Sequence, residues 1–69
     1  MRIKYTFHAK LMIKERKMEK VWIDETIKSP DIVKKEEGKY YVRKKLNGFI
    51  IEVVYTKERY INVLTVYWI

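Results

Sequence analysis

Acid–base chemistry in this sequence centres on His8, the only histidine among its 69 residues. Imidazole is the side chain whose ordinary pKa lies nearest to neutrality, so it suits proton transfer during a reaction. RNA cleavage by attack of the 2′-hydroxyl needs such a group, a cation on the phosphate and an acid for the departing 5′ oxygen. His8 is expected where a strand leads into a helix, and a helix N-terminus also favours bound phosphate. The alternative is that His8 only forms a hydrogen bond near the helix start.

Cationic residues supply the candidate phosphate-binding groups, and the chain has a formal net charge of +7 with a pI near 9.7. The planar guanidinium of Arg16 could clamp a phosphate, or it could instead pair with Glu19 or Glu52. A basic surface attracts RNA and acidic proteins alike. The alternative is that the lysine excess is only the solvated surface of a folded domain.

A second basic group is expected on a strand, where Arg43 and Lys45 share one face with Tyr41. Basic and aromatic residues that alternate across a sheet can hold a nucleic-acid backbone while its bases stack. The alternative is a solvated strand edge on which lysines prevent pairing with other chains.

Composition predicts one folded domain over residues 1–69, because the hydrophobic fraction is 48% and the aromatic fraction is 14%. The sequence has no cysteine, which excludes disulfides, cysteine-ligated zinc and thiol nucleophiles. With a single histidine as well, neither a metal nor a cofactor is expected. The absence of glutamine, with only two asparagines among many Lys and Glu residues, resembles proteins from heat-loving organisms.

No apolar run approaches the roughly 20 residues that a membrane span needs. The N-terminal residues do not have the pattern of a signal peptide. A cytoplasmic protein is therefore expected, with no membrane partner.

Periodicity and turn residues predict an α+β fold in which a strand and two helices precede an antiparallel meander. Thr6 is expected to cap the first helix, Pro30 to end the second, and Asn47-Gly48 to form a tight hairpin turn. The predicted strands are Arg2–Thr6, Ile32–Glu36, Lys39–Leu46, Phe49–Thr56 and Tyr60–Trp68, and the predicted helices run from Phe7 to Arg16 or Lys17 and from Glu19 to Ser29.

Alternation along the last two strands predicts which residues meet the helices. On the first of these strands the apolar set is Phe49, Ile51, Val53 and Tyr55, which is expected to pack against the helices. On the last strand both sets are apolar or amphipathic, so that strand is expected to be central or covered on both faces. Its two sets are Ile61, Val63, Thr65 and Tyr67, and Asn62, Leu64, Val66 and Trp68.

Three short stretches carry a resemblance to a known family: Tyr5–Ala9 with Glu15-Arg16, then Ser29-Pro30, then Val63–Trp68. The first stretch contains a His-Ala pair and an Arg eight residues after the His. With the order of elements, these motifs resemble the RelE/ParE-like toxin superfamily. Within it they are most similar to a small domain-of-unknown-function family numbered forty-two fifty-eight.

The resemblance implies a fold with the helices on one face of the sheet. The groups that carry out the activity would lie on the other face, here called the working face. It also implies RNA cleavage, often on the ribosome, by a toxin that an acidic antitoxin-like protein neutralises. Thr65 and Tyr67 would lie on the working face, where Tyr67 would donate a proton or stack on a base. The alternative is that Tyr67 only closes a small core. The sequence departs from the family at Met12, where an arginine is frequent, and at Lys17, where glycine is expected.

Together with the resemblance, these observations predict an endoribonuclease that works without metal, with His8 and Tyr67 as catalytic residues and with Arg16, Arg43, Lys45 and Tyr41 binding the RNA. The first alternative is a basic module that blocks its target by occupancy, as ParE-like relatives act on DNA gyrase. Met12 in place of arginine favours that alternative. A homodimer formed through an exposed strand face is a third reading.

Overall fold

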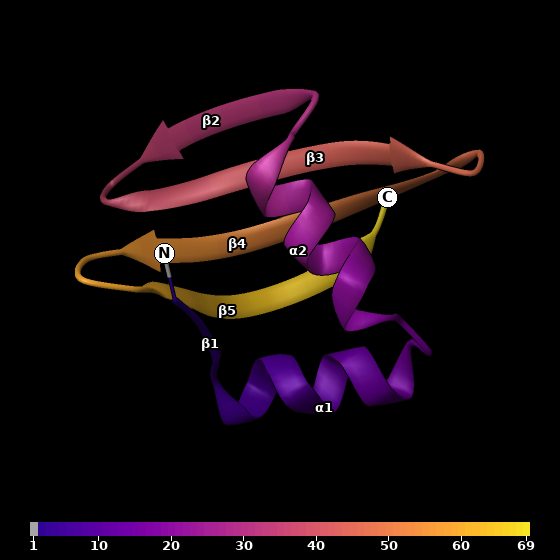
Figure 1. The fold of residues 1–69 in the computed structure, drawn as a ribbon, viewed down its shortest axis with the longest axis horizontal. Coiled ribbons are helices and arrows are strands. Elements are labelled where there is room, and N and C mark those ends of the chain that lie inside the picture. The colour runs from indigo at the N-terminus through magenta and orange to yellow at the C-terminus, as the bar shows by residue number, and fades with distance from the viewer. Residues whose placement is uncertain (1) are drawn as a thin grey trace.

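A computed structural model describes residues 2–69 and shows a five-stranded sheet and two helices (Figure 1). Along the chain, both helices come between the first and the second strand. The α+β fold expected from the sequence is confirmed, and each element ends within two residues of its predicted boundary. The elements in chain order are β1 (Ile3–Tyr5), α1 (Phe7–Glu15), α2 (Lys20–Lys28), β2 (Ile32–Glu36), β3 (Lys39–Leu46), β4 (Phe49–Lys57) and β5 (Ile61–Trp68).

The strands lie in the order β1-β5-β4-β3-β2, so the chain's first and last strands are neighbours. Strands β2 to β5 form the predicted antiparallel meander, each paired with the next in sequence. Strand β1 joins the sheet parallel to β5, with Ile3 opposite Ile61 and Tyr5 opposite Val63. The sheet is therefore mixed, and β1 and β2 form its two edges.

Local hydrogen bonds fix both ends of α1. The Thr6 hydroxyl caps its start by accepting from the Ala9 backbone N–H at 3.0 Å. At its end, Lys17 adopts a positive φ of 52°, and the Met18 N–H donates to the Ile13 carbonyl at 2.9 Å. This is the closing motif that usually places glycine at the position of Lys17.

Across residues 2–69, no helix has the length and apolar character needed to cross a bilayer.

Two tight turns set the register of the meander. Asn47 and Gly48 have φ values of 51° and 85°, and Glu37 and Gly38 have values of 50° and 79°. Positive φ at both central positions is what a type I′ hairpin turn requires. The Asn47-Gly48 turn is the one most clearly signalled by the sequence, and it forms as predicted.

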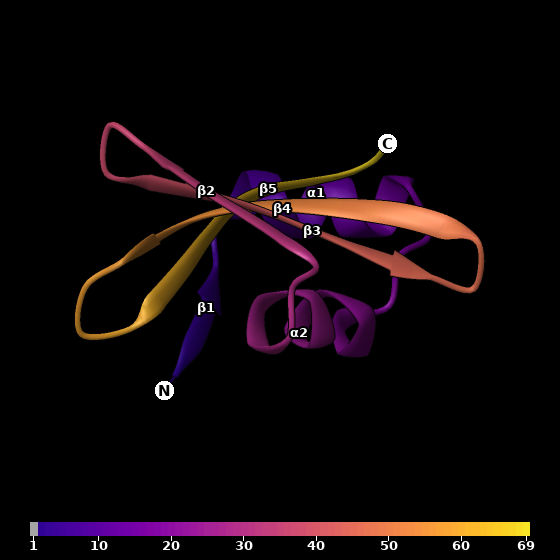
Figure 2. The same ribbon diagram turned by 90° about the horizontal axis from the view of Figure 1, so that it is seen from above.

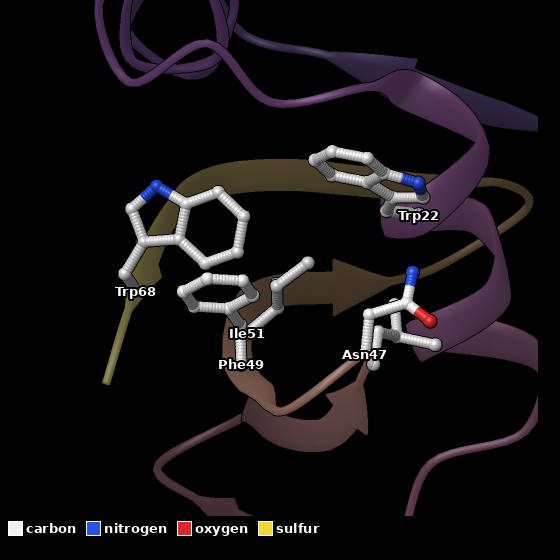
Figure 3. A pocket seen from close by; sticks show the side chains of 6 residues that line it. Trp22, Asn47, Phe49, Ile51 and Trp68 are labelled. Carbon is white, nitrogen blue, oxygen red and sulfur yellow. The ribbon is translucent and has the colours of Figure 1, made fainter.

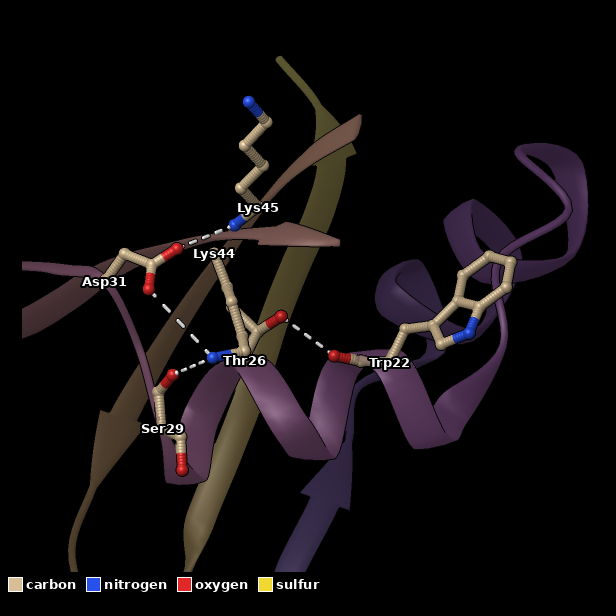
Figure 4. Close-up of polar contacts among 6 residues, drawn as sticks. All are labelled: Trp22, Thr26, Ser29, Asp31, Lys44 and Lys45. Atoms are coloured by element: carbon tan, nitrogen blue, oxygen red, sulfur yellow. Dashed lines mark hydrogen bonds and ion pairs between the residues drawn. The ribbon is translucent and has the colours of Figure 1, made fainter. Parts of the chain in front are cut away.

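Side chains and backbone of β3 hold the connection from α2 to β2 (Figure 4). The Lys44 ammonium donates to the Ser29 carbonyl at 2.7 Å, beside the end of α2. The Lys45 backbone N–H donates to a carboxylate oxygen of Asp31 at 2.8 Å. With Pro30 between Ser29 and Asp31, these bonds turn the chain sharply from the helix into the sheet.

The core lies between the sheet and the helices. Helix α2 crosses one side of the sheet, whereas α1 runs beside β5 and turns its buried residues toward the same core (Figure 2). Of the predicted inward set on β4, Ile51, Val53 and Tyr55 are buried, while Phe49 at the strand's start is 63% exposed. The buried cluster comprises Ala9, Ile13, Met18, Ile23, Ile27, Val42, Ile51, Val53, Tyr55, Ile61, Val63 and Val66.

Strand β5 departs from simple alternation. Tyr55 pairs with Val63, but its neighbour Val54 pairs with Thr65, so Leu64 has no partner on β4. Such a bulge shifts the side-chain pattern by one residue. The prediction that Ile61, Val63, Thr65 and Tyr67 share one face is therefore wrong: the first two enter the core, and the last two lie on the opposite face.

A hydrogen bond ties β1 to α2, since the Tyr5 hydroxyl donates to an Asp24 carboxylate oxygen at 2.7 Å. Burial raises the pKa of Tyr5, and Asp24 raises it further. We expect Tyr5→Phe to lower the free energy of unfolding by about 1–2 kcal/mol, measured by urea denaturation.

The folded state holds the Tyr5 hydroxyl proton more tightly than the unfolded chain, whose tyrosine pKa is about 10. Its contribution is therefore complete below about pH 10 and is lost above it, so stability should fall less steeply there in Tyr5→Phe. An identical alkaline profile in the variant would contradict this role.

Candidate nucleic-acid interface

The sheet face opposite α2, here called the open face, gathers most of the polar residues singled out from the sequence. In the described part of the chain no helix lies over it (Figure 2). On β3 it carries Tyr41, Arg43 and Lys45, which alternate with the buried Val42. On β4 and β5 it carries Glu52, Thr65 and Tyr67.

One row of side chains crosses this face from the β5 edge to β3. The Arg16 guanidinium lies 5.7 Å from the centre of the Tyr67 ring. Tyr67 is paired with Glu52 on β4, and Glu52 is paired with Arg43 on β3. The Arg43 guanidinium donates to the Glu52 carboxylate at 2.7 Å. Adjacent strands are about 4.8 Å apart. The row therefore has one guanidinium group at each end, with a phenol and a carboxylate between them.

A second row lies about 6–7 Å along the strands, which is the spacing of residues two apart. It begins with His8, whose Nε2 is 3.3 Å from the Thr65 hydroxyl. Thr65 is paired with Val54, and Val54 with Tyr41. The His8 side chain is exposed, so a ligand on the open face can reach it.

Helix α1 is held against β5, so His8 and Arg16 lie at the edge of the open face beside that strand. Beyond the short β1, backbone carbonyls of β5 have no strand partner on that side. The Thr6 hydroxyl donates to the Leu64 carbonyl at 3.1 Å, and Arg16 Nη1 donates to the Val66 carbonyl at 2.8 Å. These bonds satisfy an edge that would otherwise invite pairing with another chain. They also fix where the Arg16 guanidinium lies.

Tyr67 keeps its proton well beyond neutral pH. Burial raises its pKa, and the nearby Glu52 carboxylate and Tyr41 raise it further, against a lowering by Arg43. A phenol whose ionised form is disfavoured in this way donates a hydrogen bond reliably. It gives up the proton only to a strong base, such as the oxygen released when a phosphodiester breaks.

The remaining predicted residues lie on β3, two strands away from β5. Arg43 and Tyr41 line a shallow cavity of about 280 Å³ together with Lys34, Glu36 and Glu52. Lys45 pairs with Ile50, one row beyond Arg43 and two rows from His8. The structure thus places His8, Arg16 and Tyr67 along one edge, with His8 and Arg16 at opposite ends of α1. The open face extends from there through Tyr41 and Arg43, and Lys45 lies at its margin.

Glu52 is the residue of the candidate site that the sequence analysis does not assign to it. The sequence offers Glu52 as an alternative partner for Arg16, but Glu52 pairs with Arg43, and Arg16 binds a backbone carbonyl instead. Its side chain is 9% exposed, whereas that of Arg43 is 44% exposed. The available signal was a lone acid within the otherwise apolar start of β4, since a charge that close to the core is retained only with a partner.

Metal ligands are not grouped within residues 2–69, where no three His, Cys, Asp or Glu side chains lie close enough to hold an ion. The groups that the open face offers for chemistry include an imidazole, two phenols, a carboxylate and two guanidinium groups.

The fold and this basic, aromatic face define a small α+β protein with one covered and one open sheet face. The chain belongs to the family described as "Domain of unknown function (DUF4258)", whose model matches residues 5–68. That match includes His8, Arg16 and Tyr67 and spans β5 to Trp68. Neither a curated protein nor a solved structure matches the chain.

Proposed function

We propose that this protein is a RelE/ParE-like toxin that binds single-stranded RNA on its open face and cleaves it without a metal ion. The observation that supports this best is that His8, Arg16 and Tyr67 lie along one edge of that face, where His8 contacts Thr65 and Arg16 contacts Val66 and Tyr67 of β5. An acid–base group, a phosphate-binding cation and a proton donor are the groups that the reaction needs. The order of elements and the net charge of +7 agree with the proposal.

In the proposed reaction His8 takes the proton of the 2′-hydroxyl, and the 2′ oxygen forms a new bond to phosphorus. The bond from phosphorus to the 5′ oxygen breaks, and that oxygen takes a proton from Tyr67. The products are a 2′,3′-cyclic phosphate and a free 5′-hydroxyl, after which His8 and Tyr67 exchange protons with water. Arg16 stabilises the charge that builds up on the phosphate, since a guanidinium in a fixed position needs no reorganisation during the step.

Partners and location belong to the same proposal. A cytoplasmic protein with this activity needs an inhibitor, and an acidic antitoxin-like protein complements its positive charge. The ribosome would supply messenger RNA in an extended form.

The test is to incubate the pure protein with messenger RNA, with and without ribosomes, and to map new ends by primer extension. We expect discrete cuts whose downstream fragments accept phosphate from a polynucleotide kinase without prior dephosphorylation, because their 5′ ends are hydroxyls. A folded protein that binds RNA and leaves it intact under both conditions would contradict the nuclease. It would favour the binding module, which two observations support: Arg43 is engaged by Glu52, and Met12 packs against the core where relatives are expected to carry an arginine.

A further inference from the structure

A groove lined by aromatic residues lies on the helix side of the sheet, where α2 meets β5 and the turn between β3 and β4 (Figure 3). This aromatic groove consists of two adjoining cavities of about 100 and about 470 Å³, which share Trp22, Phe49 and Trp68. Its total size is that of a site for a small organic group. It is separate from the open face, because Phe49 and Trp68 alternate with residues of that face along β4 and β5.

The aromatic rings of this groove are arranged to accept another ring. The centre of the Trp68 ring lies 5.7 Å from that of Phe49, edge to face, and 6.0 Å from that of Trp22, tilted by 60°. Trp68 is 37% exposed. A tryptophan and a phenylalanine left open to solvent side by side offer flat surfaces on which a planar group can stack.

The two ends of the groove carry different polar groups. At the smaller cavity the Asn47 side-chain amide points in toward Trp22, and it presents both a donor and an acceptor (Figure 3). At the larger cavity Lys17 supplies a cation, and the Arg16 backbone carbonyl accepts from the Trp68 indole N–H. The complementary ligand is a flat ring with a hydrogen-bonding edge and a negative charge on its far side, which describes a nucleotide.

Arg16 connects the groove to the open face. Its guanidinium lies by Tyr67 on the open face, and its backbone carbonyl accepts from the Trp68 indole N–H at 3.2 Å on the groove side. An RNA strand that leaves the open face at Tyr67 therefore passes Arg16 before it reaches Trp68. We infer that the aromatic groove binds a base that flanks the bound segment of the same RNA, with the linking phosphate at Lys17. This inference rests on the RNA-binding function proposed above.

Both tryptophans of the chain line the groove, so intrinsic tryptophan fluorescence reports on it directly. The probe is a hexamer of adenine nucleotides with 2′-O-methyl groups, which cannot be cleaved by 2′-hydroxyl attack. We expect saturable quenching of the wild-type fluorescence, because a base stacks against Trp68. Phe49→Ala should reduce the quenching and weaken binding about fivefold or more, as expected for the loss of one stacking contact.

Phe7→Ala is the matched control, since Phe7 is also an exposed phenylalanine, 83% accessible, at the start of α1. It should bind the hexamer as the wild type does. His8→Ala should quench normally while losing cleavage, which separates the groove from the chemistry.

Failure of the inference and failure of the proposed function give different results. The hexamer could bind without a change in fluorescence, or with equal affinity in Phe49→Ala and Phe7→Ala. Either result would show that no base binds in the groove and would leave the open face as the RNA site. Normal quenching in a protein that never cleaves RNA would support the groove and contradict the nuclease. An acidic amphipathic peptide that quenches where the hexamer does not would instead identify a protein-docking surface, and the inference would be wrong. No binding of the hexamer at all would overturn both.

Discussion

Replacing His8 with alanine is expected to slow RNA cleavage by at least about 100-fold, because a positioned general acid or base typically contributes 10²–10⁴-fold. The loss should appear in single-turnover rates at saturating RNA, with little change in RNA affinity. Stability should be almost unaffected, since His8 is exposed and, within residues 2–69, its side chain has a hydrogen-bond contact only with the Thr65 hydroxyl. Exposed substitutions of this kind usually change the free energy of unfolding by less than about 0.5 kcal/mol.

Thr65→Val provides the companion variant for His8. It keeps the shape of the side chain and removes the hydroxyl that lies 3.3 Å from His8 Nε2. A smaller loss of rate than in His8→Ala is expected, because the imidazole remains but is less well oriented. Undiminished cleavage by a folded His8→Ala protein would exclude His8 as the base and direct attention to Glu52. A protein that fails to fold would show instead that His8 has a structural role.

The second large effect is an asymmetry between the partners of the Arg43–Glu52 ion pair. Arg43→Met should lower the free energy of unfolding by about 2–3 kcal/mol, because it leaves a poorly hydrated carboxylate without its cation. Glu52→Gln should cost much less, because the side chain of Arg43 is 44% exposed and can turn to water. Urea denaturation at neutral pH measures both values.

A double variant decides whether the unpaired charge is the cause of that asymmetry. Arg43→Met combined with Glu52→Leu removes both charges and should recover most of the stability lost in Arg43→Met alone. Equal losses in the two single variants, or no recovery in the double variant, would show that packing rather than charge dominates. The double variant is also the proper reference for RNA affinity, because it lacks the Arg43 guanidinium without the unpaired carboxylate.

Features that depend on neighbouring residues were predictable from the sequence. The Asn47-Gly48 turn follows from the positive φ that both residues tolerate, and the start of α1 follows from a threonine that can cap it. Pro30 ends α2 because the residue before a proline avoids helical geometry. Each of these signals is local, so the positions of most elements could be predicted without knowledge of their packing.

Features that depend on distant partners were not predictable. The unpaired Leu64 gives no local signal, yet it reverses the faces of Ile61 and Val63 relative to Tyr67. The position of β1 beside β5 is fixed by pairing across the whole chain. Candidate residues could be chosen by chemical type, as with His8 and Arg16, but the place of Glu52 among them required the register of three strands.

The pairing of β1 with β5 has a consequence for the newly made chain. Thr6 and Leu64, which bond across that junction, are 58 positions apart, so the N-terminal segment has no docking surface until β5 exists. At about 5–20 residues per second, synthesis leaves that segment waiting for several seconds. The residues that meet at the candidate site come from both ends, His8 and Arg16 from the first third and Thr65 and Tyr67 from β5. A nascent chain therefore lacks the completed site until β5 has left the ribosome.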